Sequence, residues 1–177
     1  MRHARQMVVA ALGFTLAVSV ARAAGAQQTS GFWEIGTDAA LTIGLDDPKF
    51  VALAIPAGLI RAGYFTTPTV SIEPLFQWFS VGTENTEGFS VYTLGVGVLF
   101  HRSVSRMAQQ VYLRPFLLIT DGSGGGGAAL TFGGGVGLKR PLFGGRAATR
   151  AEANLSYNES SEQLNLTGQL GLSLYTR

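Results

Sequence analysis

The sequence predicts an all-β protein, a single antiparallel up-and-down transmembrane barrel of eight strands. Three observations predict it. From Phe32 onwards, apolar residues alternate with small or polar ones, which is the pattern of strands with two unlike faces. The alternating stretches run for about 10–13 residues, long enough to cross a bilayer and longer than the usual strand of a soluble domain. Only 14% of the residues are charged, against about 25% in ordinary soluble domains, so the polar faces are almost uncharged.

The first 26 residues have the pattern of a signal peptide. A basic segment, MRHARQ, precedes an apolar run of roughly 14 residues, which is shorter than the roughly 20 that a membrane helix needs. Small residues at 24–26 offer a cleavage site before Gln27, and those at 21–23 offer a second one. We therefore expect a signal peptide over 1–26 and a barrel domain over 27–177, with an N-terminal membrane anchor as the alternative for the first segment.

Charge and cysteine content exclude several classes of function. Without residues 1–26 the chain keeps ten basic and eleven acidic residues, so the pI of 9.2 describes the precursor and gives no reason to expect nucleic-acid binding. The absence of cysteine excludes a disulfide framework and a thiolate metal site. Glycine is abundant, at 24 of 177 residues, and glycine within strands favours close packing inside a narrow barrel.

The predicted strands follow one another with short connections. The second strand changes phase around residues 56–58, where we expect a bulge. Connections are predicted at 83–88 and 101–110, and a glycine-rich loop at 121–127. The eight strands cover residues 32–45, 51–65, 70–81, 89–100, 111–120, 128–140, 146–158 and 163–177.

The first, fourth and last of these strands show the alternation most clearly. In the last strand leucines alternate with uncharged polar residues and glycine. In a membrane barrel the leucines would face lipid and the polar residues the lumen, and closure of the sheet would pair every backbone group. The apolar faces are Trp33, Ile35, Ala39, Leu41, Ile43 and Leu45 in the first strand, Tyr92, Leu94, Val96, Val98 and Phe100 in the fourth, and Leu164, Leu166, Leu170, Leu172 and Leu174 in the last.

The connections between strands sort by charge when they are numbered alternately. This sorting is expected if alternate connections lie at opposite ends of one barrel, each end with its own charge. The odd connections hold Asp46, Asp47, Glu84, Glu87, Asp121, Glu159 and Glu162, with Lys49 as their basic residue. The even connections and the C-terminus hold Arg102, Arg106, Arg140, Arg146 and Arg177.

Aromatic residues fall near the ends of the predicted strands, where girdles mark the two membrane–water boundaries of such barrels. The alternative is that aromatic residues simply favour strands. One predicted girdle contains Phe32, Trp33, Tyr64, Phe65, Phe100, Tyr112 and Tyr175, and the other contains Trp78, Phe89 and Tyr157.

The mature chain resembles a known family, the small eight-stranded outer-membrane barrel proteins of Gram-negative bacteria. Its tail resembles their C-terminal assembly signal, polar-x-Gly-x-x-apolar-x-aromatic, through Gln169, Gly171 and Leu174, although Thr176 stands where an aromatic residue is expected. The resemblance implies export to the cell outer membrane and contact with outer-membrane lipid and lipopolysaccharide. It also implies recognition of the C-terminal strand by the barrel-assembly machinery. It carries over no functional residue.

An internal echo predicts an ion pair inside the barrel. VSIEPLF (70–76) and VYLRPFL (111–117) share the order valine, any residue, apolar residue, charge, proline. Both begin strands that run in the same direction, so Glu73 and Arg114 should lie at similar height and point inwards. The strand between them offers inward glycines that leave room, Gly95 and Gly97. We expect Glu73 and Arg114 to pair across the lumen.

Five further charged residues of the strands are expected to join this polar interior, because unpaired charges there are costly: Glu34, Asp38, Arg61, Arg150 and Glu152. Pro74 and Pro115 should each cause a bulge or a missing ladder bond. The predicted structural lumen cluster consists of Glu34, Asp38, Arg61, Glu73, Arg114, Arg150 and Glu152. Its charges are nearly balanced, which favours a filled core over a selective pore.

The sequence offers little support for catalysis, and no cofactor or metal site is expected. His101 and Ser103 have the His-x-Ser spacing of outer-membrane lipid A deacylases, but the predicted connection is periplasmic and holds no acidic partner. We expect a structural or surface-interaction role. The alternatives are a narrow channel for small solutes and a soluble, periplasmic lipocalin-like carrier, whose apolar faces would point inwards. A lipid-modifying enzyme comes last.

Overall fold

The computed structural model describes residues 31–46, 49–54, 59–83, 86–104, 109–123 and 127–176, so the predicted signal peptide lies outside the described residues. None of the helices among the described residues is long and apolar enough to cross a membrane. One short 3₁₀ turn, η1, covers Phe143–Gly145. The strands are β1 (Trp33–Gly44), β2 (Val51–Ala54), β3 (Leu59–Thr67), β4 (Val70–Thr83), β5 (Thr86–Val104), β6 (Gln109–Gly122), β7 (Ala129–Leu142), β8 (Ala147–Asn158) and β9 (Gln163–Tyr175).

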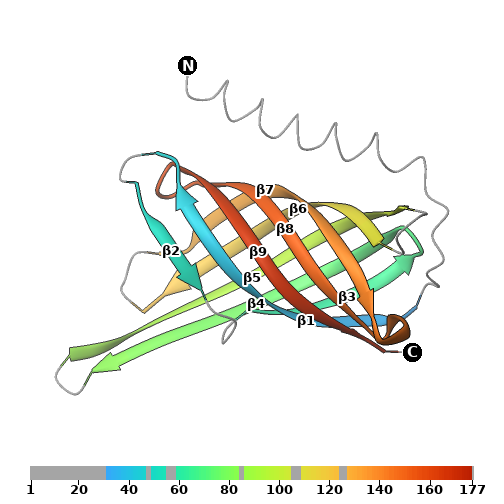
Figure 1. Ribbon diagram of the computed structural model, residues 1–177. Helices are drawn as coiled ribbons and strands as arrows, with labels where there is room; N and C mark the ends of the chain where they lie inside the picture. The colour runs from blue at the N-terminus through green and yellow to red at the C-terminus, as the bar shows by residue number, and fades with distance from the viewer. Residues whose placement is uncertain are drawn as a thin grey trace.

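The strands form one closed antiparallel sheet. From β3 to β9 each strand pairs with the next, β3 pairs with β1, and β9 closes the barrel on β1. The closing ladder is long, from Glu34 opposite Tyr175 to Gly44 opposite Asn165. Figure 1 shows the strands tilted around a common axis. β2 and β3 pair with successive stretches of β1 and together count as one strand of the barrel. The prediction of an eight-stranded up-and-down barrel is therefore confirmed.

β2 and β3 together form the predicted second strand. Both pair with the same edge of β1, but Ala54 and Ile60 lie opposite β1 residues that are only three apart. Three extra residues therefore separate the two segments. An odd number of extra residues reverses the inward and outward faces, so Leu53 is exposed whereas Arg61 is buried. The predicted change of phase is present, as a break between two strands; residues 56–58 themselves lie outside the described residues.

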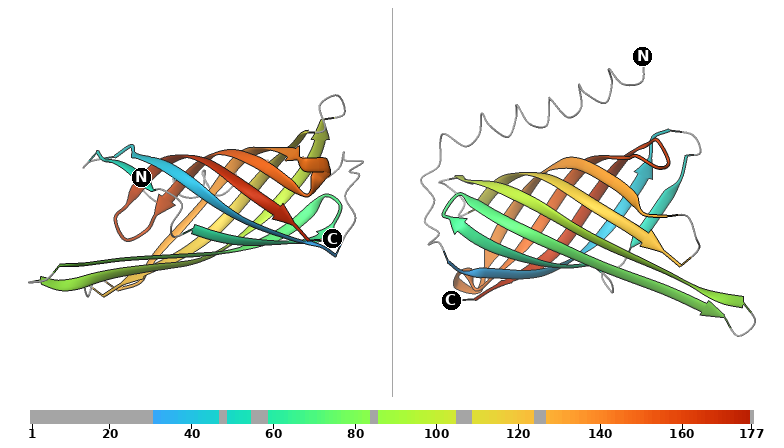
Figure 2. Two further views of the ribbon diagram at one scale, coloured as in Figure 1. Left: turned by 60° about the horizontal axis from the view of Figure 1, so that its bottom comes forward. Right: turned by 180° about the vertical axis from the view of Figure 1, so that it is seen from behind.

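The β4–β5 hairpin is longer than predicted. The predicted loop over 83–88 is wrong, because β4 continues to Thr83 and β5 begins at Thr86, with those two residues paired. β3 pairs with β4 only as far as Gln77, and β6 pairs with β5 only from Val91. The outer part of the hairpin therefore continues as a two-stranded ribbon past the rim, which Figures 1 and 2 show from three sides. Its run of threonine, serine and aromatic residues favours strand over loop.

The predicted connection over 101–110 is also too long. β5 continues from His101 to Val104, and β6 already begins at Gln109. The alternation of faces continues through this segment, because His101 is buried and Arg102 is exposed. The cluster of polar residues in this segment suggested a loop. In a membrane barrel, however, polar residues also occur within strands, because they can face the lumen.

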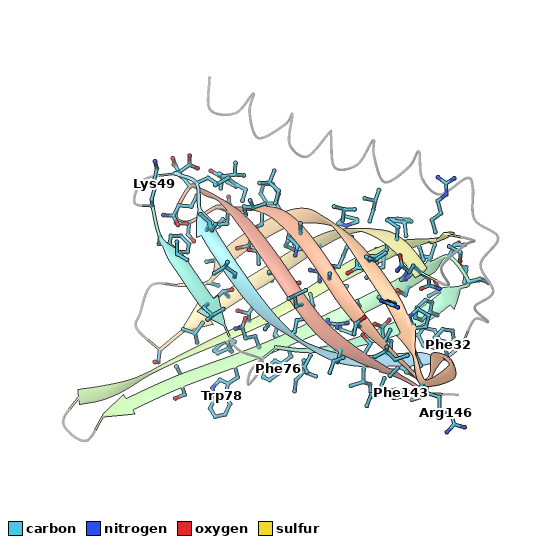
Figure 3. All side chains as sticks on the ribbon, in the orientation of Figure 1. Phe32, Lys49, Phe76, Trp78, Phe143 and Arg146 are labelled. Atoms are coloured by element: carbon cyan, nitrogen blue, oxygen red, sulfur yellow. The ribbon has the colours of Figure 1, made fainter. Side chains whose placement is uncertain are left out.

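Apolar side chains lie on the outside of the barrel and charged ones lie inside it. Figure 3 shows Phe76 and Trp78 pointing away from the sheet, and the Trp78 side chain is 60% exposed. Other large exposed apolar residues come from every strand around the barrel, among them Ile35, Ile60, Leu94, Ile119, Val136, Leu155 and Leu170. The buried charged residues are Glu34, Asp38, Arg61, Glu73, Arg114, Lys139, Arg150 and Glu152. This arrangement is the reverse of a soluble barrel.

The two ends of the barrel differ in charge. The start of β1 and the end of β9 lie side by side at one end of the barrel, where Trp33 N–H donates to Thr176 Oγ1 over 3.0 Å. Figure 3 shows Phe143 and Arg146 at this end and Lys49 at the other. We call the end with Asp46, Asp121, Glu159 and Glu162 the acidic end, and the end with Arg102, Arg140 and Arg146 the basic end. Asp47, Glu84, Arg106 and Arg177 lie outside the described residues.

Both prolines of the internal echo interrupt a ladder without shifting it. On the β3–β4 ladder no pair is formed between Arg61–Leu75 and Tyr64–Ile72, the stretch that contains Pro74. The β5–β6 ladder has the same gap around Pro115. The register continues unchanged across both gaps, so the missing bond was the correct alternative and the bulge was not. The reason is that proline lacks an N–H donor but keeps a φ close to that of a strand.

Inward glycines receive the side chains of neighbouring strands. A Cβ atom added to Gly137 would collide with the Tyr112 ring, one added to Gly133 with the Phe116 ring, and one added to Gly97 would lie 3.1 Å from Arg114 Cδ. The large lumen side chains therefore fit because a glycine beside each of them leaves its Cβ position empty.

Gly171→Ala should destabilise the barrel, because the new methyl group would collide with the Asp38 carboxylate and with Thr37 O, a backbone atom. Overpacking of this kind costs about 1–3 kcal/mol. Gly168→Ala is the matched control in the same strand, since its Cβ would meet nothing within 4 Å, and alanine in a strand is favoured over glycine by roughly 0.5–1 kcal/mol. Urea unfolding in detergent micelles, followed by tryptophan fluorescence, measures both. Equal stability of the two variants would contradict this packing.

Candidate functional site

The candidate site is the ion network in the middle of the lumen, and Glu73 of β4 is at its centre. The Glu73 side chain is fully buried and contacts arginines from three other strands. Arg150 Nη1 lies 2.6 Å from Glu73 Oε2, Arg114 Nη1 lies 3.2 Å from Oε1, and Arg61 Nη1 lies 3.3 Å from Oε2. One carboxylate therefore joins β3, β4, β6 and β8 across the barrel.

On one side of Glu73, the network continues to β1. Arg61 donates from Nε and from Nη2 to the two carboxylate oxygens of Asp38, the second bond measuring 2.9 Å. This fork-to-fork geometry is the strongest form of a carboxylate–guanidinium contact. Arg61 Nη1 also lies 3.4 Å from Glu34 Oε1, and Lys139 Nζ of β7 lies 2.5 Å from Glu34 Oε2. The chain of pairs thus reaches β7 through Glu34.

On the other side, Glu152 of β8 receives three partners. Arg150 donates to Glu152 Oε2 from Nη2 and, over 3.1 Å, from Nε. The Tyr112 hydroxyl donates to the same oxygen over 2.5 Å. Arg114 Nη2 lies 2.5 Å from Glu152 Oε1, in a geometry that makes the contact an ion pair rather than a hydrogen bond. Four acids and four bases thus form one connected, electrically balanced group.

All seven residues expected inside the lumen are buried there, and each takes part in the network. Glu73 and Arg114 make direct contact, with the Arg114 side chain over Gly97 as expected; Gly95 is instead covered by Leu118. Sequence reasoning missed Lys139, which lies in the predicted strand 128–140 but was not assigned to the lumen cluster. The signal was present, because Lys139 continues the inward phase of Gly133, Gly135 and Gly137.

Aromatic rings cross the lumen at the basic end. Phe65 and Tyr112 are almost fully buried, so their assignment to an outer girdle was wrong. Phe65 stacks on Phe32, with ring centroids 4.3 Å apart, and on His101 at 4.9 Å. Tyr175 meets the Phe32 ring edge-on at 5.9 Å. Trp33 and Tyr64 of the same predicted girdle do lie on the outside, and the Phe89 side chain lies outside the described residues.

His101 contacts a serine other than the one suggested by the sequence. Its Nε2 lies 2.8 Å from Ser71 Oγ of β4, and both side chains are buried. Within the described chain His101 Nδ1 has no hydrogen-bond partner, so no carboxylate orients the ring as a catalytic pair requires. No group of three or more metal-ligating side chains occurs among the described residues.

Between the ion network and the acidic end lies a chamber of about 240 Å³. Asp38 and Arg114 form its floor, and side chains of β1, β4, β5, β6, β8 and β9 form its walls. We call it the lumen chamber. Its lining consists of Asp38, Ala40, Thr42, Leu75, Gln77, Thr93, Arg114, Phe116, Leu118, Asn154, Ser156, Thr167 and Gln169.

Known structures share this architecture. Ail, the attachment invasion locus protein of Yersinia pestis, aligns over 84% of this chain and 100% of its own, with a TM-score of 0.52 at 16% identity. The N-terminal β-barrel domain of Pseudomonas aeruginosa OprF covers the same shares with a TM-score of 0.54 at 14% identity. A designed transmembrane β-barrel aligns over 84% of this chain and 98% of its own, with a TM-score of 0.53 at 13% identity. The chain has the fold of an eight-stranded outer-membrane barrel.

At these identities the likeness between this barrel and the solved ones is one of fold alone. No family model and no curated protein sequence matches the chain. The side chains inside this barrel, and not its relatives, must therefore supply any argument about its function.

Glu73→Gln should destabilise the barrel by about 3–5 kcal/mol, because it leaves three buried arginines with an uncompensated charge. Glu159→Gln, in the exposed β8–β9 turn, is the control and should change the free energy of unfolding by less than about 0.5 kcal/mol. Urea unfolding in micelles measures both. Similar small losses for the two variants would show that the network contributes nothing specific.

Proposed function

We propose that the protein is an integral outer-membrane β-barrel with a structural or surface-interaction role and a polar, largely filled lumen. The observation that carries the proposal is the distribution of side chains, apolar outside and charged inside. A bilayer stabilises such an exterior, whereas water would not. Most strands of the barrel have 12 to 14 residues. They are therefore long enough to cross a bilayer, since a tilted membrane strand needs about 9–11 residues.

Two layers of side chains support a lumen that is closed to solutes. The ion network joins six strands, and the rings of Phe32, Phe65, His101 and Tyr112 lie beyond it towards the basic end. Every charged member of the network has a partner of opposite sign, so no mobile ion is needed to neutralise it. A narrow channel is the second candidate, because the lumen chamber leaves open space between the ion network and the acidic end.

A soluble lipocalin-like carrier is the weakest of the barrel alternatives. Such a carrier needs an apolar cavity and a charged exterior. Here the exterior carries residues such as Trp78 and Leu170, each exposed by 60% or more, while the interior holds the charges.

Surface charge gives some guidance about partners. Ail has been solved in complex with a heparin analogue, sucrose octasulfate, which is a polyanion. The acidic end of this barrel carries Asp46, Asp121, Glu159 and Glu162, so it would repel a polyanion. We propose outer-membrane lipid and lipopolysaccharide as its surroundings, and recognition of β9 by the barrel-assembly machinery during insertion.

We place the acidic end outside the cell and the basic end in the periplasm. In outer-membrane barrels the periplasmic turns are short and the outer loops are longer. At the basic end the β7–β8 turn is a single 3₁₀ turn, whereas the acidic end carries the extended β4–β5 ribbon. Export directed by residues 1–26 completes the proposal.

Single-cysteine labelling tests both the location and the orientation, since the chain has no native cysteine. Ser160→Cys, in the exposed β8–β9 turn, should react with a membrane-impermeant maleimide on intact cells. Phe143→Cys, at a position 83% exposed at the basic end, should react only after the outer membrane is permeabilised. The opposite labelling pattern would reverse the orientation. If no labelled protein were recovered in the outer-membrane fraction from either variant, the proposed location would be contradicted.

Planar-bilayer recording tests the closed lumen. The purified barrel should give no stable conductance steps, because the ion network and the aromatic rings fill the lumen at successive levels. Phe65→Ala, which removes the ring that contacts both Phe32 and His101, should give no steps either, since the network remains. Reproducible steps for the unmodified protein would favour the narrow channel instead.

A further inference from the structure

The lumen chamber has two unlike walls. Its polar wall comes from three adjacent strands, β8, β9 and β1, and carries Asn154, Ser156, Thr167, Gln169 and Thr42. The facing wall comes from β4, β5 and β6 and is mostly apolar, with Leu75, Phe116 and Leu118, and it adds polar groups from Gln77 and Thr93. A ligand that fits between these walls has one hydrogen-bonding edge and one apolar face.

Several polar groups of the lining are available to a ligand. Within the described chain, the side chains of Gln77 and Ser156 form no hydrogen bond. Asn154 and Gln169 accept weak bonds from Arg114 through their carbonyl oxygens, at 3.5 and 3.4 Å, and no described group accepts from their amide N–H groups. Polar groups left without partners in a cavity are satisfied by water or by a ligand that replaces it.

Charge on the chamber floor is already neutralised. Asp38 is held by the fork of Arg61, and Arg114 is held by Glu73 and Glu152. An ion entering the chamber would find no unpaired charge of opposite sign, while losing much of its hydration. The chamber therefore favours a neutral ligand over an anion or a cation.

Size restricts the ligand further. The volume of about 240 Å³ is below the roughly 300–1,000 Å³ of pockets for drug-sized molecules. It holds one small ring with its substituents. A pyranose presents hydroxyl groups around its edge and C–H groups on its faces, which matches a chamber with amides and hydroxyls along one wall and an aromatic ring in the other.

We propose that the lumen chamber is a binding site for a small, neutral, hydroxyl-rich ring compound, of the class of a monosaccharide or cyclic polyol. Amide and hydroxyl groups of β8, β9 and β1, together with the Gln77 amide of β4, hydrogen-bond the edge of the ring, and Leu75, Phe116 and Leu118 pack against its apolar face. This inference goes beyond the proposed function. It requires neither a particular membrane nor a conducting lumen, so it fails or holds separately from both.

Saturation-transfer difference NMR on the refolded barrel tests the proposal. The probes are D-glucose, D-galactose, N-acetyl-D-glucosamine and myo-inositol, with glucuronate as the charged comparison. The micelle must be an amine-oxide detergent, because maltoside and glucoside headgroups are sugars and would compete. We expect saturable binding of at least one neutral probe and weaker binding of glucuronate.

Substitutions locate the site. Ser156→Phe fills the chamber and should abolish the signal, whereas Ser80→Phe is the matched control on the exposed β4–β5 ribbon and should leave it unchanged. Gln77→Ala keeps the chamber open should Ser156→Phe fail to fold, and it should weaken binding by roughly two- to tenfold, the factor for one hydrogen bond. Circular dichroism checks that each variant forms a barrel.

Three results would overturn the proposal. The first is the absence of saturable binding for every neutral probe, which would leave the chamber to water. The second is binding that is unaffected both by Ser156→Phe and by Gln77→Ala in folded protein, which would place the ligand elsewhere. Tighter binding of glucuronate than of glucose would replace the neutral ligand with an anion and equally contradict the inference.

Discussion

Pairing of charge inside a narrow, closed sheet is the constraint on which the rest of this structure depends. An eight-stranded barrel has little room inside for water, so each lumen charge must meet an opposite charge or remain at high cost. Glu73 satisfies this requirement for three arginines at once. The glycines on neighbouring strands follow from it, because Arg114 can reach Glu73 only across Gly97 and Asp38 fits only beside Gly171.

Much of this arrangement could be predicted because a barrel strand has a strict period of two. The alternation assigns a face to each residue, so the sequence alone places Glu34, Asp38, Arg61, Arg150 and Glu152 inside the barrel. The pairing of Glu73 with Arg114 followed from two strands with the same order of residues. Prolines beside both charges leave gaps in the ladder without changing its register, and for this reason the alternation remained readable across them.

Some features that sequence reasoning missed were present in the alternation, and others depend on neighbours that one strand does not reveal. Lys139 shares the inward face of Gly137, but its partner Glu34, 2.5 Å away, comes from a distant strand. Tyr112 shares the inward face of Arg114, and its position near a strand end suggested a girdle instead; the structure shows it crossing the lumen with Phe65 and His101. The lumen chamber combines residues from six strands, so no local pattern announces it.

The central claim is that apolar residues cover the outside of a closed barrel whose charges are inside. Heat-modifiable gel mobility of residues 27–177, refolded either in detergent or in plain buffer, tests it most directly. The account predicts a faster-migrating unheated band that forms in detergent and is absent in buffer, because the exposed Trp78, Leu94 and Leu170 need an apolar surrounding. A soluble, folded monomer in plain buffer would contradict it, since the apolar faces would then have to point inwards.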